Sequence, residues 1–159
     1  RLDLFEVDAY FIRGDWTVQG QLSYGRQKSA AISADPVTGE MRDARWWGAS
    51  GLVAYKLNPR LEAVARLDYL NNRKNGGGLL TYSFSDDRNG FGPDTAGDPE
   101  RGANRMALAL GMSYRYNLAT TFKAEARFDR ADLPVFLDVK SGSYRKANSV
   151  FGTSVVVAF

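Results

Sequence analysis

Apolar and polar side chains alternate with a period of two residues over most of this chain of 159 residues. Between residues 121 and 129, every even-numbered residue is Phe or Ala, whereas the odd-numbered residues from Lys123 onward all carry a charge. A helix would scatter these charges around its circumference, but a strand gathers them on one face. The alternation predicts seven strands, at residues 2–12, 16–27, 45–57, 61–70, 105–116, 121–129 and 149–159.

Short and long connections alternate between the predicted strands. The short connections are 13–15, 58–60 and 117–120. The long connections are 28–44, 71–104 and 130–148. All short turns therefore fall at one end of the sheet and all long loops at the other, as in outer-membrane barrels. We expect one all-β, antiparallel, up-and-down segment over residues 1–159.

The composition excludes several classes of function. The mean hydropathy is −0.35, and no apolar run approaches the roughly 18–20 residues that a membrane-spanning helix needs. The chain has no His and no Cys, so it lacks the commonest general base, the commonest metal ligand and every thiolate. We expect no enzyme, no catalytic residue, no cofactor and no metal. The net charge of +3 is too weak to predict a nucleic-acid partner.

Aromatic residues stand near both ends of the apolar faces, at even spacings of six or eight residues. At about 3.3 Å per residue, eight residues span roughly 26 Å, or roughly 19 Å of depth at a tilt of about 45°. This depth is close to the apolar band of about 25 Å between the two aromatic girdles of a membrane barrel. The predicted girdle residues are Phe5, Phe11, Trp16, Tyr24, Trp47, Tyr55, Phe122, Phe128, Phe151 and Phe159.

A soluble β-sandwich or a lipocalin-like barrel, with the aromatic residues in its core, is the alternative fold. In that fold the charged faces are simply solvated surface. However, seven apolar faces need a second covering layer of equal area, and no segment of the chain is left to supply it. The patterning therefore favours a transmembrane β-barrel, in which lipid covers the apolar face.

The C-terminal segment carries a recognisable pattern, Phe151-x-Thr153-x-Val155-x-Val157-x-Phe159. It resembles the last strand of Gram-negative outer-membrane β-barrel proteins, and the strand, turn and loop pattern is similar to the C-terminal part of porin-like proteobacterial proteins. The resemblance implies an outer-membrane location, contact with membrane lipid, and assembly as a homotrimer, which is common among porins. It also implies recognition by the barrel-assembly machinery, through Phe151, Val155, Val157 and Phe159. Thr153 departs from the pattern because it is less apolar than usual.

Seven strands are an odd number, whereas bacterial single-chain barrels have even numbers and normally keep both termini in the periplasm. We therefore expect the chain to be the C-terminal segment of a longer barrel, about half of one with 12–18 strands. An eight-stranded barrel that lacks its first strand is the alternative.

If the apolar face meets lipid, the charged face meets the lumen. The predicted pore-lining residues are Glu62, Arg66, Asp68, Arg105, Arg115, Lys123, Glu125, Arg127 and Asp129. These charged side chains are compatible with a water-filled channel, because in a dry core they would be buried without solvation. We expect passive diffusion of small hydrophilic solutes or ions, with little ion selectivity because the signs balance. In a narrow barrel the charges would instead pair with one another, for example Glu125 with Arg115, and carry nothing.

The long loops suggest further roles. Residues 79–84 could form a short strand or a constriction inside the pore. Acidic residues between Asp86 and Glu100 could bind Ca²⁺, although a solvated external loop is favoured. Four basic residues could contact lipopolysaccharide phosphates or be solvated surface: Arg73, Lys74, Arg145 and Lys146. A structural or adhesive barrel whose external loops bind a partner is the alternative function.

Overall fold

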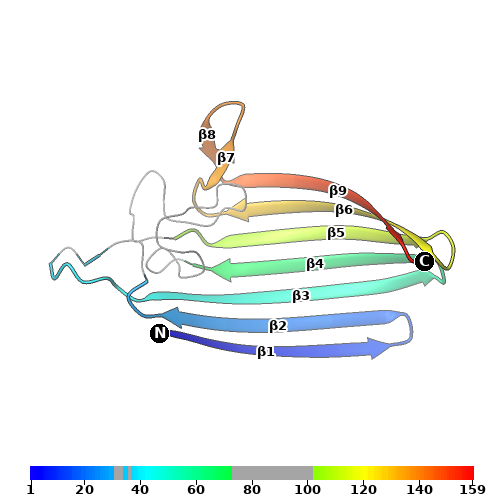
Figure 1. Cartoon of the computed structure of the whole chain (residues 1–159), viewed down its shortest axis with the longest axis horizontal. Coiled ribbons are helices and arrows are strands. Elements are labelled where there is room, and N and C mark those ends of the chain that lie inside the picture. The colour runs from blue at the N-terminus through cyan, green and yellow to red at the C-terminus, as the bar shows by residue number, and fades with distance from the viewer. Residues whose placement is uncertain (31–33, 36, 73–101) are drawn as a thin grey trace.

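The computed structural model describes residues 1–30, 34–35, 37–72 and 102–159, and it contains a single antiparallel sheet of seven strands (Figure 1). The strands of this sheet are β1 (Leu2–Arg13), β2 (Trp16–Gln27), β3 (Ala44–Asn58), β4 (Leu61–Asn71), β5 (Arg105–Arg115), β6 (Thr120–Ala131) and β9 (Ala147–Val157). They pair in this order, so each strand lies beside the next one along the chain, except that β7 and β8 intervene between β6 and β9. The all-β antiparallel prediction is confirmed. Among the described residues there is no helix long and apolar enough to cross a bilayer.

The pairing register keeps the apolar residues on one face of the sheet. Phe5 lies opposite Tyr24, which lies opposite Trp47. Further along, Leu108 lies opposite Phe128. Residues that face each other directly across two strands point to the same side, and the alternation holds through β9. One face of all seven strands is therefore mainly apolar, and the other carries most of the charges.

The short turns lie together at one end of the sheet (Figure 1). In two of them an Asn side chain accepts hydrogen bonds from backbone N–H groups of the turn. The Oδ1 atom of Asn58 accepts hydrogen bonds of 2.9 and 3.0 Å from the backbone N–H groups two and three residues later. Asn117 does the same at 2.9 and 2.7 Å. These Asx turns reverse the chain within a few residues.

The segment 130–148, predicted as a loop, contains more regular structure. β6 continues to Ala131, and a separate hairpin forms from β7 (Phe136–Asp138) and β8 (Ser143–Arg145). The hairpin is anchored by a small apolar cluster at the long-loop end of the sheet. Its buried members are Ala103, Ala131, Leu133, Val135 and Phe136.

Few side chains of this sheet are fully enclosed, and one of the buried ones depends on a glycine. Trp46 of β3 is buried and lies opposite Gly25 of β2. A Cβ atom at Gly25 would stand 2.1 Å from Cζ2 of Trp46. The indole therefore covers the glycine backbone on the charged face, near the long-loop end.

The sheet is open in this structure. β1 pairs only with β2, and β9 pairs only with β6, so each has one edge without a strand partner among the described residues. The closure expected of a complete barrel is thus not present within the described residues.

Candidate functional site

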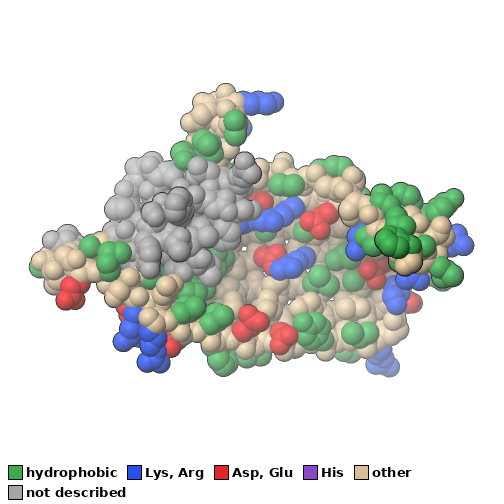
Figure 2. Space-filling model, in the orientation of Figure 1, with side chains coloured by type: hydrophobic (Ala, Val, Ile, Leu, Met, Phe, Trp, Pro, Cys, Tyr) green, Lys and Arg blue, Asp and Glu red, His purple; other side chains and the backbone are tan. Residues whose placement is uncertain are grey.

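The charged face is the candidate site. The register brings the nine predicted pore-lining residues to this face: for example, Glu62 and Lys123 both lie opposite Ser113. Figure 2 shows acidic and basic side chains gathered over the middle of one face of the molecule. The pairing of Glu125 with Arg115, the example given for the alternative of a narrow barrel, does not fit the register, because Glu125 lies opposite Gly111 and Arg115 lies opposite Thr121.

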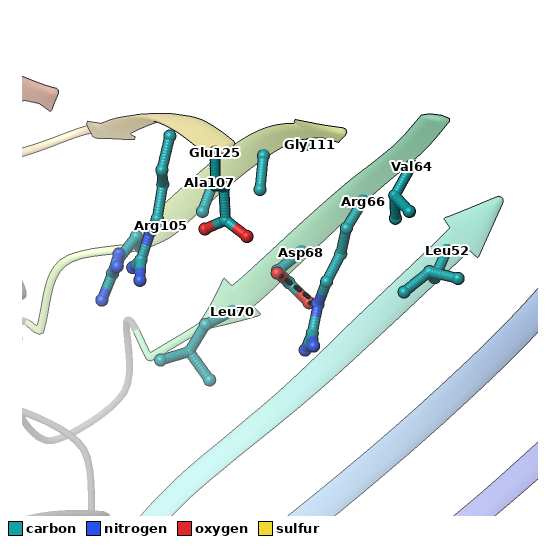
Figure 3. Close-up of a pocket in the computed structure, with 11 residues that line it drawn as sticks. Leu52, Val64, Arg66, Asp68, Leu70, Arg105, Ala107, Gly111 and Glu125 are labelled. Carbon is teal, nitrogen blue, oxygen red and sulfur yellow. Dashed lines mark hydrogen bonds and ion pairs between the residues drawn. The ribbon is translucent and has the colours of Figure 1, made fainter. Parts of the chain in front are cut away.

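A hollow with a volume of about 570 Å³ lies on this face, over β3, β4, β5 and β6. Its floor is the middle of β5, which presents the small residues Ala107, Ala109 and Gly111. Arg105, the first residue of the same strand, also lines the hollow. Charged side chains from β4, β5 and β6 reach into the same space (Figure 3). The middle of the hollow is open because the floor residues are small, and its charged side chains stand on the flanking strands or, for Arg105, at the beginning of β5.

On the β4 side, Arg66 and Asp68 form an exposed ion pair. The Nε atom of Arg66 lies 2.9 Å from both carboxylate oxygens of Asp68. The hydroxyl of Ser50, on β3, donates a hydrogen bond of 2.6 Å to the same carboxylate. The side chains of Arg66 and Asp68 are 49% and 36% exposed, so water reaches this pair.

On the β6 side, the equivalent pair is Arg127 and Asp129, and it belongs to a hydrogen-bond network in which Asp129 is buried. The Oδ1 atom of Asp129 accepts hydrogen bonds from Nε and Nη2 of Arg127 at 3.0 and 2.9 Å. It also accepts one of 2.7 Å from Nη2 of Arg105. The side chains of Arg105 and Asp129 are only 6% and 3% exposed. Arg105 also lies over the ring of Phe136, 6.0 Å from its centroid, which ties the sheet to the β7–β8 hairpin.

The two pairs form a repeat that the sequence prediction missed. The tetrapeptide Ala-Arg-Leu-Asp at 65–68 recurs as Ala-Arg-Phe-Asp at 126–129. Arg66 and Arg127 both lie opposite Ala109. Their aspartates both lie opposite Ala107, so β5 separates two matching Arg–Asp pairs. The repeated tetrapeptide was the signal that could have found this arrangement.

The remaining charges on this face are less constrained. Within the described part of the chain, Glu62, Lys123 and Glu125 form no ion pair, and all three line a second, shallower hollow near β9. This hollow has a volume of about 440 Å³. Side chains of both signs are therefore available to water or to a passing solute.

The opposite face carries the predicted aromatic girdle. All of these residues except Tyr55 are exposed, and Tyr55 is half-buried. Its ring packs against that of Trp16 with centroids 4.5 Å apart. At the other end of β3, Trp47 packs against Tyr69 of β4 with centroids 5.2 Å apart. The aromatic residues thus lie near both ends of the apolar face.

Two acidic side chains in the long-loop region are held in their charged form. The Arg26 guanidinium, with Nε at 3.0 Å, lowers the pKa of Asp43, and the N–H of Ser29 contributes at 3.1 Å. The hydroxyl of Ser141 and the N–H of Lys140 lower the pKa of Asp138. Hydrogen bonds to a carboxylate favour its ionised form.

Several predictions fall on residues that the structure does not describe. They are the strand or constriction at 79–84, the calcium ligands between Asp86 and Glu100, and the basic residues Arg73 and Lys74. Within the described residues, no three Asp or Glu side chains are grouped so that they could hold a metal ion.

The fold and the site define a class: an all-β protein whose seven-stranded antiparallel sheet has an exposed apolar face and a hollowed, charged face. Residues 3–159 match the model of a family described as a protein of unknown function, DUF3138, and the chain belongs to this family. No curated protein and no solved structure matches the chain.

Proposed function

We propose that this chain is part of a transmembrane β-barrel in a bacterial outer membrane, and that its charged face lines a channel for passive diffusion of small hydrophilic solutes. One observation carries the proposal. The seven strands expose a continuous apolar face on one side and gather Arg, Lys, Asp and Glu on the other. The proposal includes no enzymatic activity and no cofactor.

The exposure of the apolar face supports the membrane part of the proposal. Phe5, Leu22 and Phe151 are 66%, 61% and 73% exposed, and they stand on three different strands. Soluble proteins rarely expose apolar patches larger than a few hundred Å². Lipid would cover this face without any second layer of protein.

The strand lengths support the same reading. The strands of the sheet contain between 11 and 15 residues. At about 3.3 Å per residue, 11 residues extend roughly 36 Å, and a tilt of about 45° reduces this to roughly 26 Å. The apolar band of a transmembrane barrel is about 25 Å tall.

The open edges of β1 and β9 require partners in a bilayer. An unpaired backbone N–H or C=O group in hydrocarbon costs several kcal/mol. We therefore propose that further strands connect these two edges, so that the complete barrel has more strands than the seven described. The C-terminal residues Phe151, Val155 and Val157 are exposed on the apolar face, as the proposed recognition by the barrel-assembly machinery requires. The homotrimer remains a prediction.

The charged face supports the channel part of the proposal. In a lumen without water, the charges of Glu62, Lys123 and Glu125 would be buried without partners, and burying an unpaired charge is very costly. A hydrated lumen leaves them solvated. Acidic and basic residues are mixed across the face, so we propose a channel with weak selectivity for ion sign.

A structural or adhesive barrel is the second candidate. The observation that favours it is the β7–β8 hairpin, which stands out from the sheet (Figure 1) and exposes Val139 at its tip. Such a hairpin could present a binding surface outside the cell. This reading explains the loop but gives no role to the hollow over β5.

Single-channel recording tests the channel. The full-length protein is reconstituted in a planar bilayer, where we expect discrete conductance steps. Replacing Arg66 and Arg127 together by Gln should change the step size, because both guanidinium groups stand over the hollow. Arg13→Gln, at the β1–β2 turn, is the matched control and should leave it unchanged. A membrane that stays sealed contradicts the channel, and a protein that stays folded and soluble without detergent contradicts the membrane placement.

A further inference from the structure

A third hollow, larger than the two on the charged face, lies on the other side of the sheet, beneath the β7–β8 hairpin. Its volume is about 970 Å³. Three apolar side chains of the exposed face contribute to it: Met106 and Leu108 from β5, and Phe128 from β6. The rest of the lining comes from the hairpin, from the first residues of β9 and from Asp129 and Arg130 of β6. The hollow is therefore apolar toward the middle of the strands and polar toward the long-loop end.

The polar part of this hollow is basic. Arg130, Lys140 and Arg145 line it. Arg145 is neutralised by an ion pair with Asp138. Arg130 and Lys140 form no ion pair with any residue that the structure describes, and both are exposed.

The other carboxylate near the hollow does not compensate these cations. Asp129 lines the same hollow, but its carboxylate is buried among Arg105 and Arg127, whose guanidinium groups both donate to it. Among the described residues, Arg130 and Lys140 therefore have no counter-ion, and they lie beside an apolar surface.

We propose that this hollow binds a membrane lipid whose phosphate-bearing headgroup carries a net negative charge. The acyl chain lies along Met106, Leu108 and Phe128, and the phosphate lies between Arg130 and Lys140. Guanidinium and ammonium groups form strong, charge-assisted hydrogen bonds with phosphate oxygens. The apolar floor selects a lipid over free phosphate, because only a lipid covers both parts of the hollow.

The inference rests on the proposed membrane placement, and it concerns a different surface from the channel. In that placement the apolar face meets the acyl chains, and the long-loop end meets the headgroups. Arg130 belongs to the same face as Met106, which lies directly opposite it. The site is therefore at the depth where lipid phosphates are found.

Lipid binding to the full-length protein in detergent micelles tests the site. Short-chain phosphatidic acid, phosphatidylcholine of the same chain length and inorganic phosphate are titrated separately by calorimetry. We expect phosphatidic acid to bind about tenfold more tightly than phosphatidylcholine. We expect no binding of inorganic phosphate at the same concentrations.

Replacing Arg130 and Lys140 together by Gln should weaken phosphatidic acid binding about tenfold and leave phosphatidylcholine binding unchanged. The matched control replaces Arg13 and Arg60, two cations at the short-turn end, and should change neither. Far-UV circular dichroism verifies that each variant is folded. If the double variant does not fold, the single variant Lys140→Gln, at the exposed hairpin tip, replaces it in the titrations.

The outcomes separate this inference from the channel proposal. Equal binding of phosphatidic acid by the wild type and the folded Gln variants overturns the lipid site, and so does inorganic phosphate binding as tightly as the lipid. A protein that conducts in bilayers but binds both lipids equally refutes the lipid site alone. A protein that does not enter bilayers refutes the membrane placement itself.

Discussion

The two Arg–Asp pairs that flank β5 have the same sequence spacing and the same register but different burial, which predicts different costs for the same substitution. Asp129→Asn leaves the guanidinium of Arg105 buried, with a neutral amide in place of its carboxylate. Breaking a buried ion pair in this way costs about 3–5 kcal/mol. Because Arg105 has other interactions as well, we expect the lower end, about 3 kcal/mol.

Asp68→Asn is the matched control for this change. Asp68 and its partner Arg66 are both open to water, and exposed ion pairs contribute about 0–1 kcal/mol. The hydroxyl of Ser50 can still donate to the amide oxygen that replaces the carboxylate. We therefore expect the two Asn variants to differ in unfolding free energy by about 2 kcal/mol or more.

Equilibrium unfolding in urea, from phospholipid vesicles and followed by tryptophan fluorescence, measures both costs. The unfolding midpoint should fall for Asp129→Asn at an unchanged slope, which identifies a change in stability rather than in exposed surface. Replacing Arg105 by Met and Asp129 by Leu together should recover part of the loss, because no buried charge then lacks a partner. Equal destabilisation by Asp68→Asn and Asp129→Asn would refute the reasoning.

Three further predictions concern other parts of the sheet. Gly25→Ala forces Trp46 away, because the new Cβ atom would stand 2.1 Å from the indole; we expect a loss of about 1–3 kcal/mol and a red-shifted tryptophan emission. The lowered pKa of Asp43 means that its bond to Arg26 stabilises the 28–43 connection above the ordinary Asp pKa of about 3.9. This stabilisation is lost as the pH falls through the lowered value, and limited proteolysis should detect the loosening. Leu110→Arg, on the exposed apolar face, should cost about 2–4 kcal/mol of stability in vesicles.

Each of these predictions has a control in the same sheet. Gly20→Ala should be mild, because nothing lies within 4 Å of its added Cβ atom. Asp43→Asn should reduce the acid-dependent step in proteolysis; a smaller step remains because the pKa of Asp35, in the same connection, is also lowered by the N–H groups of Val37 and Thr38. A step of unchanged size in this variant contradicts the assignment. Ala109→Arg places the same charge on the hollow of the opposite face. If it destabilises the protein in vesicles as much as Leu110→Arg, the proposed lipid-facing side is wrong.

The strands and faces of the sheet could be predicted from the sequence because strand geometry imposes a period of exactly two residues. The clearest case is β6, where Phe122 and Phe128 lie on one face and Lys123 and Arg127 on the other. Since each strand also pairs with its sequence neighbour, aligning the apolar faces nearly fixes the register. Only the strand ends differed: β9, for example, runs from Ala147 to Val157 instead of over residues 149–159.

The ion-pair partners and the β7–β8 hairpin could not be predicted in the same way. The bond between Arg105 and Asp129 joins residues 24 apart in sequence, and which acid a given Arg meets depends on side-chain directions that a period does not encode. The hairpin strands contain three residues each, which is too short for a periodic signal. Its anchor is the buried cluster around Phe136, which forms only when Ala103 and Ala131 are brought together.

The width of the candidate channel depends more on β5 than on the charged residues beside it. On the charged face, the middle of β5 presents only the small residues Ala107, Ala109 and Gly111. The charged residue of β5 that lines the hollow, Arg105, lies before them in the strand and bonds to Asp129. The pairs hold their guanidinium groups through carboxylates two residues away on the same strand, and each is therefore oriented along its own strand. A solute passing over β5 would meet a charged wall on either side and a low floor between them. The small residues of β5 thus create the space, and the repeated Arg–Asp pairs give that space its polarity.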